Sequence, residues 1–218
     1  MATLNKYDLA GKKTGSLQIE EGLLKAEAHS QSIKDYIVAL RKNARQWSAS
    51  TKTRAEINRT GKKPHPQKGG GRSRQGDLAA PHYKGGGIVF GPRPKFDQHV
   101  RINKKERRAA IAFLLAEKIK AEKVFVLHHG ALETPKTKSV AEFFDALKIS
   151  SQRALVLGAG KDKNKSHQNF LLSLRNLPKK EYALMTQIDG YSLAKAQHLI
   201  VLDTAFDQLL AMLGGANE

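Results

Sequence analysis

The chain has 218 residues and carries a net charge of +18 at pH 7. Such an excess of positive charge opposes a compact monomer and calls for a polyanionic partner, of which nucleic acid is the commonest. The absence of cysteine excludes disulfides and cysteine-based zinc or iron–sulfur sites. No secretory signal opens the sequence, and its longest apolar run, residues 109–116, is too short to span a bilayer. We therefore expect a cytoplasmic protein without a membrane partner.

Two elements are predicted before the charge rises. Residues 1–22 suggest a hairpin with Ala10 to Lys12 as its turn. Apolar residues then recur at helical spacing, which predicts an amphipathic helix. These residues are Ile33, Tyr36, Ile37, Leu40 and Ala44.

The positive charge belongs to one segment. From Arg41 to Arg108, 19 basic residues stand against four acidic ones, whereas the other 150 residues hold 19 basic and 16 acidic side chains. The segment also contains five of the seven prolines and two glycine triplets, and it has no helical or strand periodicity. We predict an extended arm at about residues 45–100 that interrupts a single α/β domain spanning 1–218. On its own, the arm should be mobile and open to proteases.

Regular elements resume after the arm. Asn103 and Glu106 form a plausible capping pair for a helix whose buried face carries Ile111, Leu114, Leu115 and Ile119. Four apolar runs predict buried strands at Val124–Leu127, Ala154–Leu157, Tyr182–Met185 and Leu199–Leu202. Helices are predicted from a capping box at Ser139 to Glu142, around Phe170 to Leu174, and from Phe206 to a stop at Gly214 and Gly215. Alternation of this kind predicts a three-layer α/β domain with a mainly parallel sheet of about four strands flanked by helices.

Lysine and arginine in the arm alternate with glycine, as in residues 68–76. Glycine lets the backbone approach a phosphate, and arginine adds bidentate phosphate contacts and stacking on bases. The arm's aromatic and histidine side chains are candidates for stacking or wedging: Trp47, His65, His82, Tyr83, Phe90 and Phe96. Lys104, Lys105, Arg107 and Arg108 at the start of the following helix would suit a docked anion. The alternatives are a charged linker and a solvated surface cluster.

Catalytic signals are weak. Gly158 to Lys161 follows a strand as in dinucleotide sites, but the third glycine of that fingerprint is missing. No Asp, His or Cys stands at metal-binding spacing near His128 and His129 in the sequence. Asp203 is interpreted as a helix cap with Thr204. We expect no enzyme activity, catalytic residue, metal, cofactor or small-molecule substrate.

The arm resembles a known family. The strings "NARQWSASTKTRAEINRTGKKPHPQKGGGRSRQG" and "APHYKGGGIVFGPRPKFDQHVRINKKERRAAI" closely resemble the bacterial type of large-subunit ribosomal protein L-four. "NFLLSLRNL" and "LIVLDTAFDQLLAML" look like corresponding segments, so the resemblance plausibly spans the chain. It differs from the family pattern where His65 and Pro66 follow Pro64, and where His82 and Tyr83 replace a frequent leucine and tryptophan.

The resemblance implies a structural constituent of the large ribosomal subunit that is bound to its rRNA and neighbouring ribosomal proteins. The loop tip would then line the nascent-peptide exit tunnel through Lys63, Pro64, His65, Gln67, Lys68, Gly69 and Gly70. The residues expected to contact RNA are Arg41, Arg45, Trp47, Lys52, Arg54, Arg59, Lys62, Lys63, Lys68, Arg72, Arg74, Tyr83, Lys84, Arg93, Lys95, Lys104, Lys105, Arg107 and Arg108. The alternatives are an architectural DNA-binding protein, although no DNA-binding motif is seen, and a nucleotide-dependent enzyme.

Overall fold

A computed structural model describes residues 2–94, 99–130, 132–160 and 165–214. The chain divides into two compact units, the first formed by Met1–Arg41 with Arg101–Glu218 and the second by Lys42–Val100. Unit 1 holds the strands and almost all of the helical residues, and unit 2 holds the arm.

The sheet of unit 1 has six strands in the order β2-β1-β3-β6-β4-β5. They are β1 (Ala2–Asp8), β2 (Lys13–Ile19), β3 (Val124–His128), β4 (Ala154–Gly158), β5 (Lys180–Leu184) and β6 (His198–Leu202). Only the β1–β2 pair is antiparallel; β1 continues into the sheet by pairing in parallel with β3. The α/β class and the mainly parallel sheet are confirmed, and the prediction of about four strands is corrected to six.

The two extra strands come from the hairpin proposed for residues 1–22. Its turn is confirmed: Gly11 has a φ of +75°, and its N–H donates to the carbonyl of Asp8 at 2.9 Å. The Cβ of any other residue at position 11 would lie 2.4 Å from the Cβ of Ala146. Leu4 and Ile19 are buried, but most other residues of these strands are partly exposed, because the pair forms one edge of the sheet.

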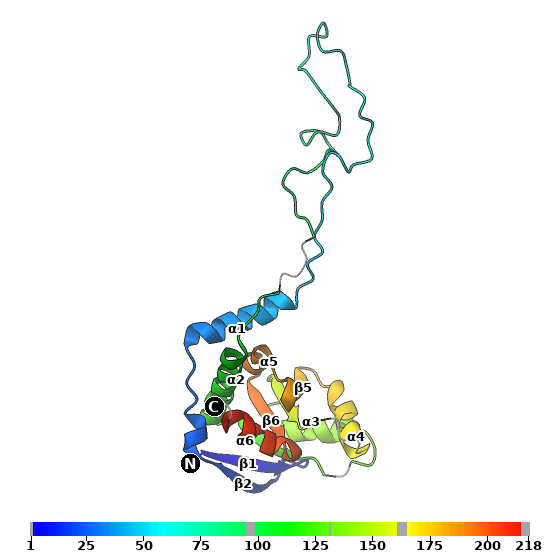
Figure 1. The fold of residues 1–218 in the computed structure, drawn as a ribbon. Helices are drawn as coiled ribbons and strands as arrows, with labels where there is room; N and C mark the ends of the chain where they lie inside the picture. The colour runs from blue at the N-terminus through cyan, green and yellow to red at the C-terminus, as the bar shows by residue number, and fades with distance from the viewer. Residues whose placement is uncertain (1, 95–98, 131, 161–164, 215–218) are drawn as a thin grey trace. The chain divides into compact units, whose positions relative to one another are not determined.

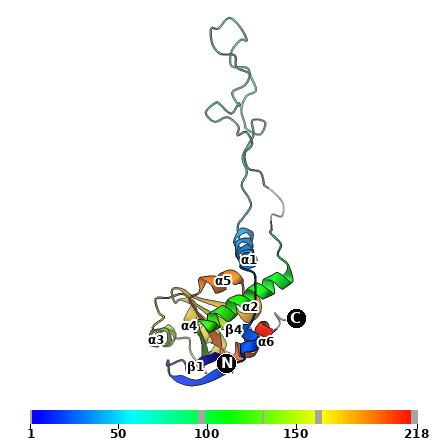
Figure 2. The same ribbon diagram turned by 90° about the vertical axis from the view of Figure 1, so that its left-hand side faces the viewer.

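Helices cover both faces of the sheet, as Figures 1 and 2 show. On one face lie α3 (Thr137–Ala146) and α4 (Lys165–Arg175), whose Phe143 and Phe170 pack with Val156 and Ile200 of the sheet. On the other face lie α2 (Lys104–Lys120), α5 (Gly190–Lys195) and α6 (Phe206–Gly214). Helix α1 (Ser30–Asn43, whose end passes into unit 2) adds Tyr36 to the cluster on this side, where the Tyr36 hydroxyl accepts from the Gly190 N–H at 3.3 Å. The described residues also form three short 3-10 helices, η1 (Glu21–Leu24), η2 (Met185–Gln187) and η3 (Asp203–Ala205).

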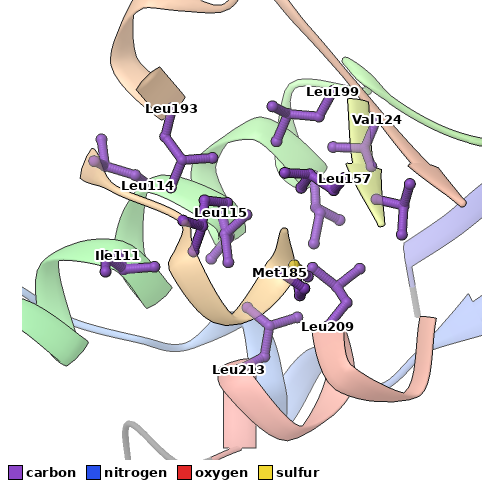
Figure 3. Close-up of a cluster of buried hydrophobic side chains, with 14 of the residues drawn as sticks. Ile111, Leu114, Leu115, Val124, Leu157, Met185, Leu193, Leu199, Leu209 and Leu213 are labelled. Atoms are coloured by element: carbon purple, nitrogen blue, oxygen red, sulfur yellow. The ribbon is translucent and has the colours of Figure 1, made fainter. Parts of the chain in front are cut away.

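The second face buries the larger cluster, drawn in Figure 3. Leu114 and Leu115 of α2 meet Leu157 of β4, Leu199 of β6 and Leu209 of α6, among others. Because β3, β4 and β6 are covered on both faces, their sequences are apolar without alternation. The strand predictions are thereby confirmed, except that β5 begins two residues earlier than expected and ends at Leu184, because Met185 begins a 3-10 helix.

Local helix signals were less reliable than the strands. Helix α2 does begin after Asn103, but that side chain makes no bond to the backbone of the helix and donates instead to Glu106 Oε1 at 3.4 Å. The capping box proposed at Ser139 is wrong. Helix α3 begins at Thr137, and the Ser139 hydroxyl lies inside its first turn and donates to the carbonyl of Lys136 at 2.9 Å.

Candidate nucleic-acid interface

The described residues of the arm contain turns and bends but no helix or strand, as expected from the lack of periodicity (Figure 1). The arm nevertheless has internal backbone order. The Thr51 N–H donates to the carbonyl of Pro92 at 3.1 Å, and the Ile88 N–H donates to that of Lys52 at 3.0 Å. These two bonds tie the outgoing chain to the returning chain. Hydrogen bonds therefore join the two chains of the arm here, and the arm is not simply an open loop.

The base of unit 2 is closed by a side chain. The amide of Asn43 accepts from the Val100 N–H at 2.9 Å and donates to the Val100 carbonyl at 3.1 Å. An asparagine amide thus supplies the same pair of hydrogen bonds that a residue of a neighbouring strand would supply. The last residue of α1 and the far end of the unit are thus held together by a side chain and not by strand pairing.

Two glycines allow the arm's chains to cross. A Cβ on Gly87 would lie 2.2 Å from the backbone nitrogen of Arg54, and one on Gly86 would lie 2.0 Å from the carbonyl oxygen of Ala80. The Gly87 N–H donates to the carbonyl of Ala79, which is 4% exposed, at 2.9 Å. We call the residues that meet here, Arg54, Ala79, Ala80, Gly86 and Gly87, the arm crossing. The glycines of the second triplet are needed for this close contact of backbones.

Arg59 organises the same part of the arm. Its Nη1 donates to the carbonyl of Leu78 at 2.7 Å and its Nη2 to the carbonyl of Lys84 at 3.0 Å. One guanidinium therefore holds two segments that lie 19 and 25 positions away in the sequence. Arg59 was predicted to contact RNA; the structure gives it internal partners, which favour a positioning role.

The acidic side chains described in the arm are also engaged internally. Glu56 pairs with Arg93 at 2.7 Å and accepts from the Thr53 N–H at 3.0 Å. These bonds, led by the one from Arg93, hold the pKa of Glu56 below its usual value. Asp77 accepts from the N–H of Ala79 at 3.0 Å. Because both carboxylates are occupied, the charge that the arm presents to a partner is positive.

The remaining predicted cations of the arm are exposed. They are Arg45, Lys52, Arg54, Lys62, Lys63, Lys68, Arg72, Arg74 and Lys84. Lys95 lies outside the described residues. Arg41, Lys104, Lys105, Arg107 and Arg108 are exposed as well, and they belong to unit 1. Long, exposed cationic side chains along an extended backbone can follow a phosphate chain without a rigid pocket.

The predicted tip has its own contacts. The His65 ring contacts the carbonyl of Ser73 through Nε2 at 3.1 Å, and the Lys63 ammonium contacts the side chain of Gln67. Gly69 and Gly71 take φ values of +89° and +60°, which close the turn between them. His65, one of the departures from the family pattern, therefore closes the loop that carries the later tip residues, from Gln67 to Gly70.

Aromatic side chains of the arm fall into three environments. The guanidinium carbon of Arg45 lies 5.5 Å from the ring centre of Trp47, which is 37% exposed. The rings of His82 and Tyr83 lie 4.4 Å apart, and Tyr83 is half-buried. Phe90 is fully exposed. Phe96 lies outside the described residues. The sequence named Phe90 as a candidate for stacking or wedging, although Phe90 is not among the residues expected to contact RNA.

The weak catalytic signals of unit 1 have structural roles. A Cβ on Gly158 would lie 2.1 Å from the hydroxyl of Tyr182, so this glycine makes room for a neighbouring side chain. Lys161, the other end of that motif, lies outside the described residues. Among the described residues no group of three or more potential ligands could hold a metal ion, and no helix among them is long and apolar enough to cross a membrane.

Asp203 is not the helix cap that we predicted. It is the first residue of η3, and its carboxylate accepts from Lys6 Nζ at 2.7 Å and lies 3.2 Å from His128 Nδ1. Burial alone would raise the pKa of Asp203, but the hydrogen bonds and charges of these two partners outweigh it and lower the pKa. Asp203 links the ends of β3 and β6 to β1, at the edge where sheets of this kind often bind ligands.

The fold and the arm define an α/β protein with a polycationic, glycine-rich insertion between two helices of its domain. The model of the ribosomal protein L4/L1 family matches residues 17–212, and the chain belongs to this family. The resemblance seen in the arm's sequence is thereby confirmed.

Curated relatives named "Large ribosomal subunit protein uL4" match almost the whole chain. The protein of Lachnospira eligens is 35% identical over 209 residues, which cover 96% of this chain and 98% of the relative. That of Acholeplasma laidlawii is 35% identical over 205 residues, 94% of this chain and 96% of the relative. That of Halothermothrix orenii is 30% identical over 214 residues, 98% of this chain and 99% of the relative.

Proposed function

We propose that this protein is a structural constituent of the large ribosomal subunit, where it binds large-subunit rRNA and extends its arm to the nascent-peptide exit tunnel. It acts in the cytoplasm, in contact with neighbouring ribosomal proteins, and without catalysis. The observation that carries the proposal is the arm's charge arrangement. Nine of its predicted RNA contacts are exposed cations, whereas the two described acids are bound within the arm.

The mechanism follows from this arrangement. Exposed lysines and arginines displace counterions from the RNA backbone, and this release supplies binding free energy without reading the base sequence. The arm crossing and Arg59 give the backbone a fixed course, so the cations meet phosphates in a set order. Recognition of a folded RNA by shape rests on such a fixed course.

Salt dependence tests the electrostatic part. With six to ten phosphate contacts, affinity for an rRNA transcript should fall by about 10³- to 10⁵-fold between 50 and 200 mM salt. A Lys68→Ala variant should reduce the slope of log affinity against log salt by about one. Nearly salt-independent binding would contradict the mechanism.

Competition separates RNA from DNA as the partner. The alternative, an architectural DNA-binding protein, predicts that duplex DNA displaces rRNA from the protein at equal concentration. We expect structured rRNA to win by a wide margin, because a fixed backbone course suits one folded RNA and not a uniform duplex. Equal affinity for both would favour the DNA alternative.

The tunnel assignment has its own test. A photo-crosslinking amino acid placed at Gln67, in the tip, should form adducts with a nascent chain in stalled ribosomes. The same group at Tyr191 of α5, which is 39% exposed, serves as the control and should form none. Assembled ribosomes in which position 67 gives no adduct, or in which position 191 gives as many, would refute the tunnel assignment.

A further inference from the structure

The arm carries three consecutive apolar side chains that its own structure leaves uncovered. Ile88, Val89 and Phe90 are 50%, 56% and 102% exposed. A fully exposed phenylalanine in a chain with this much charge is unfavourable in water, and contiguous exposed apolar groups usually mark a contact surface. The feature therefore needs a partner.

The backbone holds Phe90 in this exposed place. Its φ is +52°, a left-handed conformation that is uncommon for a bulky side chain. The two backbone hydrogen bonds between residues 51–52 and 88–92 flank it in the sequence. The next residue, Gly91, lies close to Thr51, because a Cβ at position 91 would be 2.0 Å from the Thr51 Oγ1. The contacts around Phe90 therefore hold its strained, left-handed backbone conformation in place.

The charges around this turn indicate the chemistry of the partner. Lys52, whose backbone carbonyl accepts from the Ile88 N–H, has an exposed side chain, and Glu56, four residues further along the same chain, is already paired with Arg93. The partner must combine dense negative charge with a flat apolar face. Unpaired nucleic acid has both, since every base offers a stacking face next to its phosphate. A protein surface that was equally acidic would not offer a large apolar face in the same place.

We propose that Phe90 stacks on an unpaired base of the RNA bound by the arm. The inference rests on the proposed rRNA binding and adds one aromatic contact that fixes the position of the arm on the RNA. Phosphate contacts from lysine and arginine tolerate sliding along the backbone, whereas a stacked ring requires an accessible base at one place. Phe90 then supplies a position-dependent part of recognition that the cations lack.

The test measures affinity for a large-subunit rRNA transcript at several salt concentrations, with the full-length protein. Phe90→Ala should weaken binding by roughly 5- to 150-fold, the range found for removing one stacking contact. The slope against salt should stay unchanged, since no charge is lost. Phe90→Tyr and Phe90→Trp keep a flat ring and should bind like the wild type. Phe90→Leu keeps apolar area but no flat ring, so it should bind nearly as weakly as the alanine variant.

Val89→Ala is the matched control, because it removes a neighbouring exposed apolar side chain; we expect little loss of affinity. In Phe90→Trp, RNA should quench the added fluorescence above the baseline given by the wild type, which contains only Trp47. Wild-type affinity of Phe90→Leu, or equal losses for Val89→Ala and Phe90→Ala, would overturn stacking in favour of a general apolar contact. If the wild type itself fails to bind rRNA, the proposed function fails instead.

Discussion

Gly87 offers the sharpest test of whether the arm has a defined course before it meets RNA. In Gly87→Ala the new methyl group would lie 2.2 Å from the Arg54 nitrogen and 2.6 Å from the carbonyl carbon of Thr53. Both are backbone atoms, so the two chains must separate by about 1 Å to reach ordinary packing distances. The hydrogen bonds from Gly87 and Ile88, at 2.9 and 3.0 Å, cannot survive that separation.

The magnitude follows from those two bonds. Each hydrogen bond contributes about 0.5 to 1.5 kcal/mol to the stability of the arm crossing. Alanine is less flexible than glycine, so it lowers the entropy of the opened chain and offsets about 0.4 to 1 kcal/mol of that loss. The net cost to the arm crossing is therefore about 1.3 kcal/mol at the middle of these ranges and at most about 2.6 kcal/mol. The population in which the crossing is open should rise by roughly 9-fold at that middle value and by no more than about 80-fold.

Trypsin cleavage after Arg54 and Arg59 in the free protein, with fragments identified by mass, reports this population. Gly76→Ala is the matched control, since no atom lies within 4 Å of a Cβ there and its φ is not positive. We expect faster cleavage in Gly87→Ala alone, and weaker rRNA binding at unchanged net charge. If both variants behaved like the wild type, or if both were equally sensitised, the arm crossing would not order the free arm.

Four further predictions concern unit 1. Deleting residues 50–95 should leave a domain that unfolds in one cooperative transition by circular dichroism, because that unit holds both hydrophobic clusters; a broad, non-cooperative transition would contradict this. Tyr36→Phe should lower the free energy of unfolding by about 1 to 2 kcal/mol, because the buried N–H of Gly190 loses its 3.3 Å bond, and an unchanged denaturation midpoint would show that water replaces it. Burial, and then three neighbouring lysines, lower the pKa of His198 in the folded protein. The free energy that the neutral ring contributes to folding should therefore be fully present above the unfolded pKa of 6.5 and be lost as the pH falls below that value towards the lowered folded pKa. His198→Asn should flatten this part of the profile of stability against pH. The lowered pKa of Asp203 adds a second loss as pH falls through about 3.8 and below, which Asp203→Asn should remove.

The buried strands could be predicted because burial on both faces leaves a purely apolar run in the sequence. The hairpin was harder, since at the edge of the sheet Leu4 and Ile19 are deeply buried among mostly half-exposed residues. Helix starts were the least predictable, because Ser139 has the sequence of a cap but bonds to a carbonyl within its own turn. The role of Asp203 depends on Lys6, 197 positions away, and no local pattern contains that information.

In the arm, too, the sequence predicted local properties but not contacts between distant residues. Its extent and sign of charge follow from composition, which is a local property. The partners of Arg59 and the close fit of Gly87 against Arg54 arise where distant parts of the arm meet, so they required coordinates. Phe90 is similar, because the sequence shows an aromatic residue but not that it is uncovered and held with a positive φ.

The pair of hydrogen bonds between Asn43 and Val100, which we call the Asn43 clamp, has a consequence for how such a protein changes over evolution. It joins residues 57 positions apart, so the ends of the insertion stay together whatever lies between them. Doubling the length of a flexible closed loop costs only about 0.6 kcal/mol. Insertions and deletions beyond the clamp should therefore leave the stability of the domain almost unaffected. Selection can then adjust the reach of the arm separately from the fold that carries it.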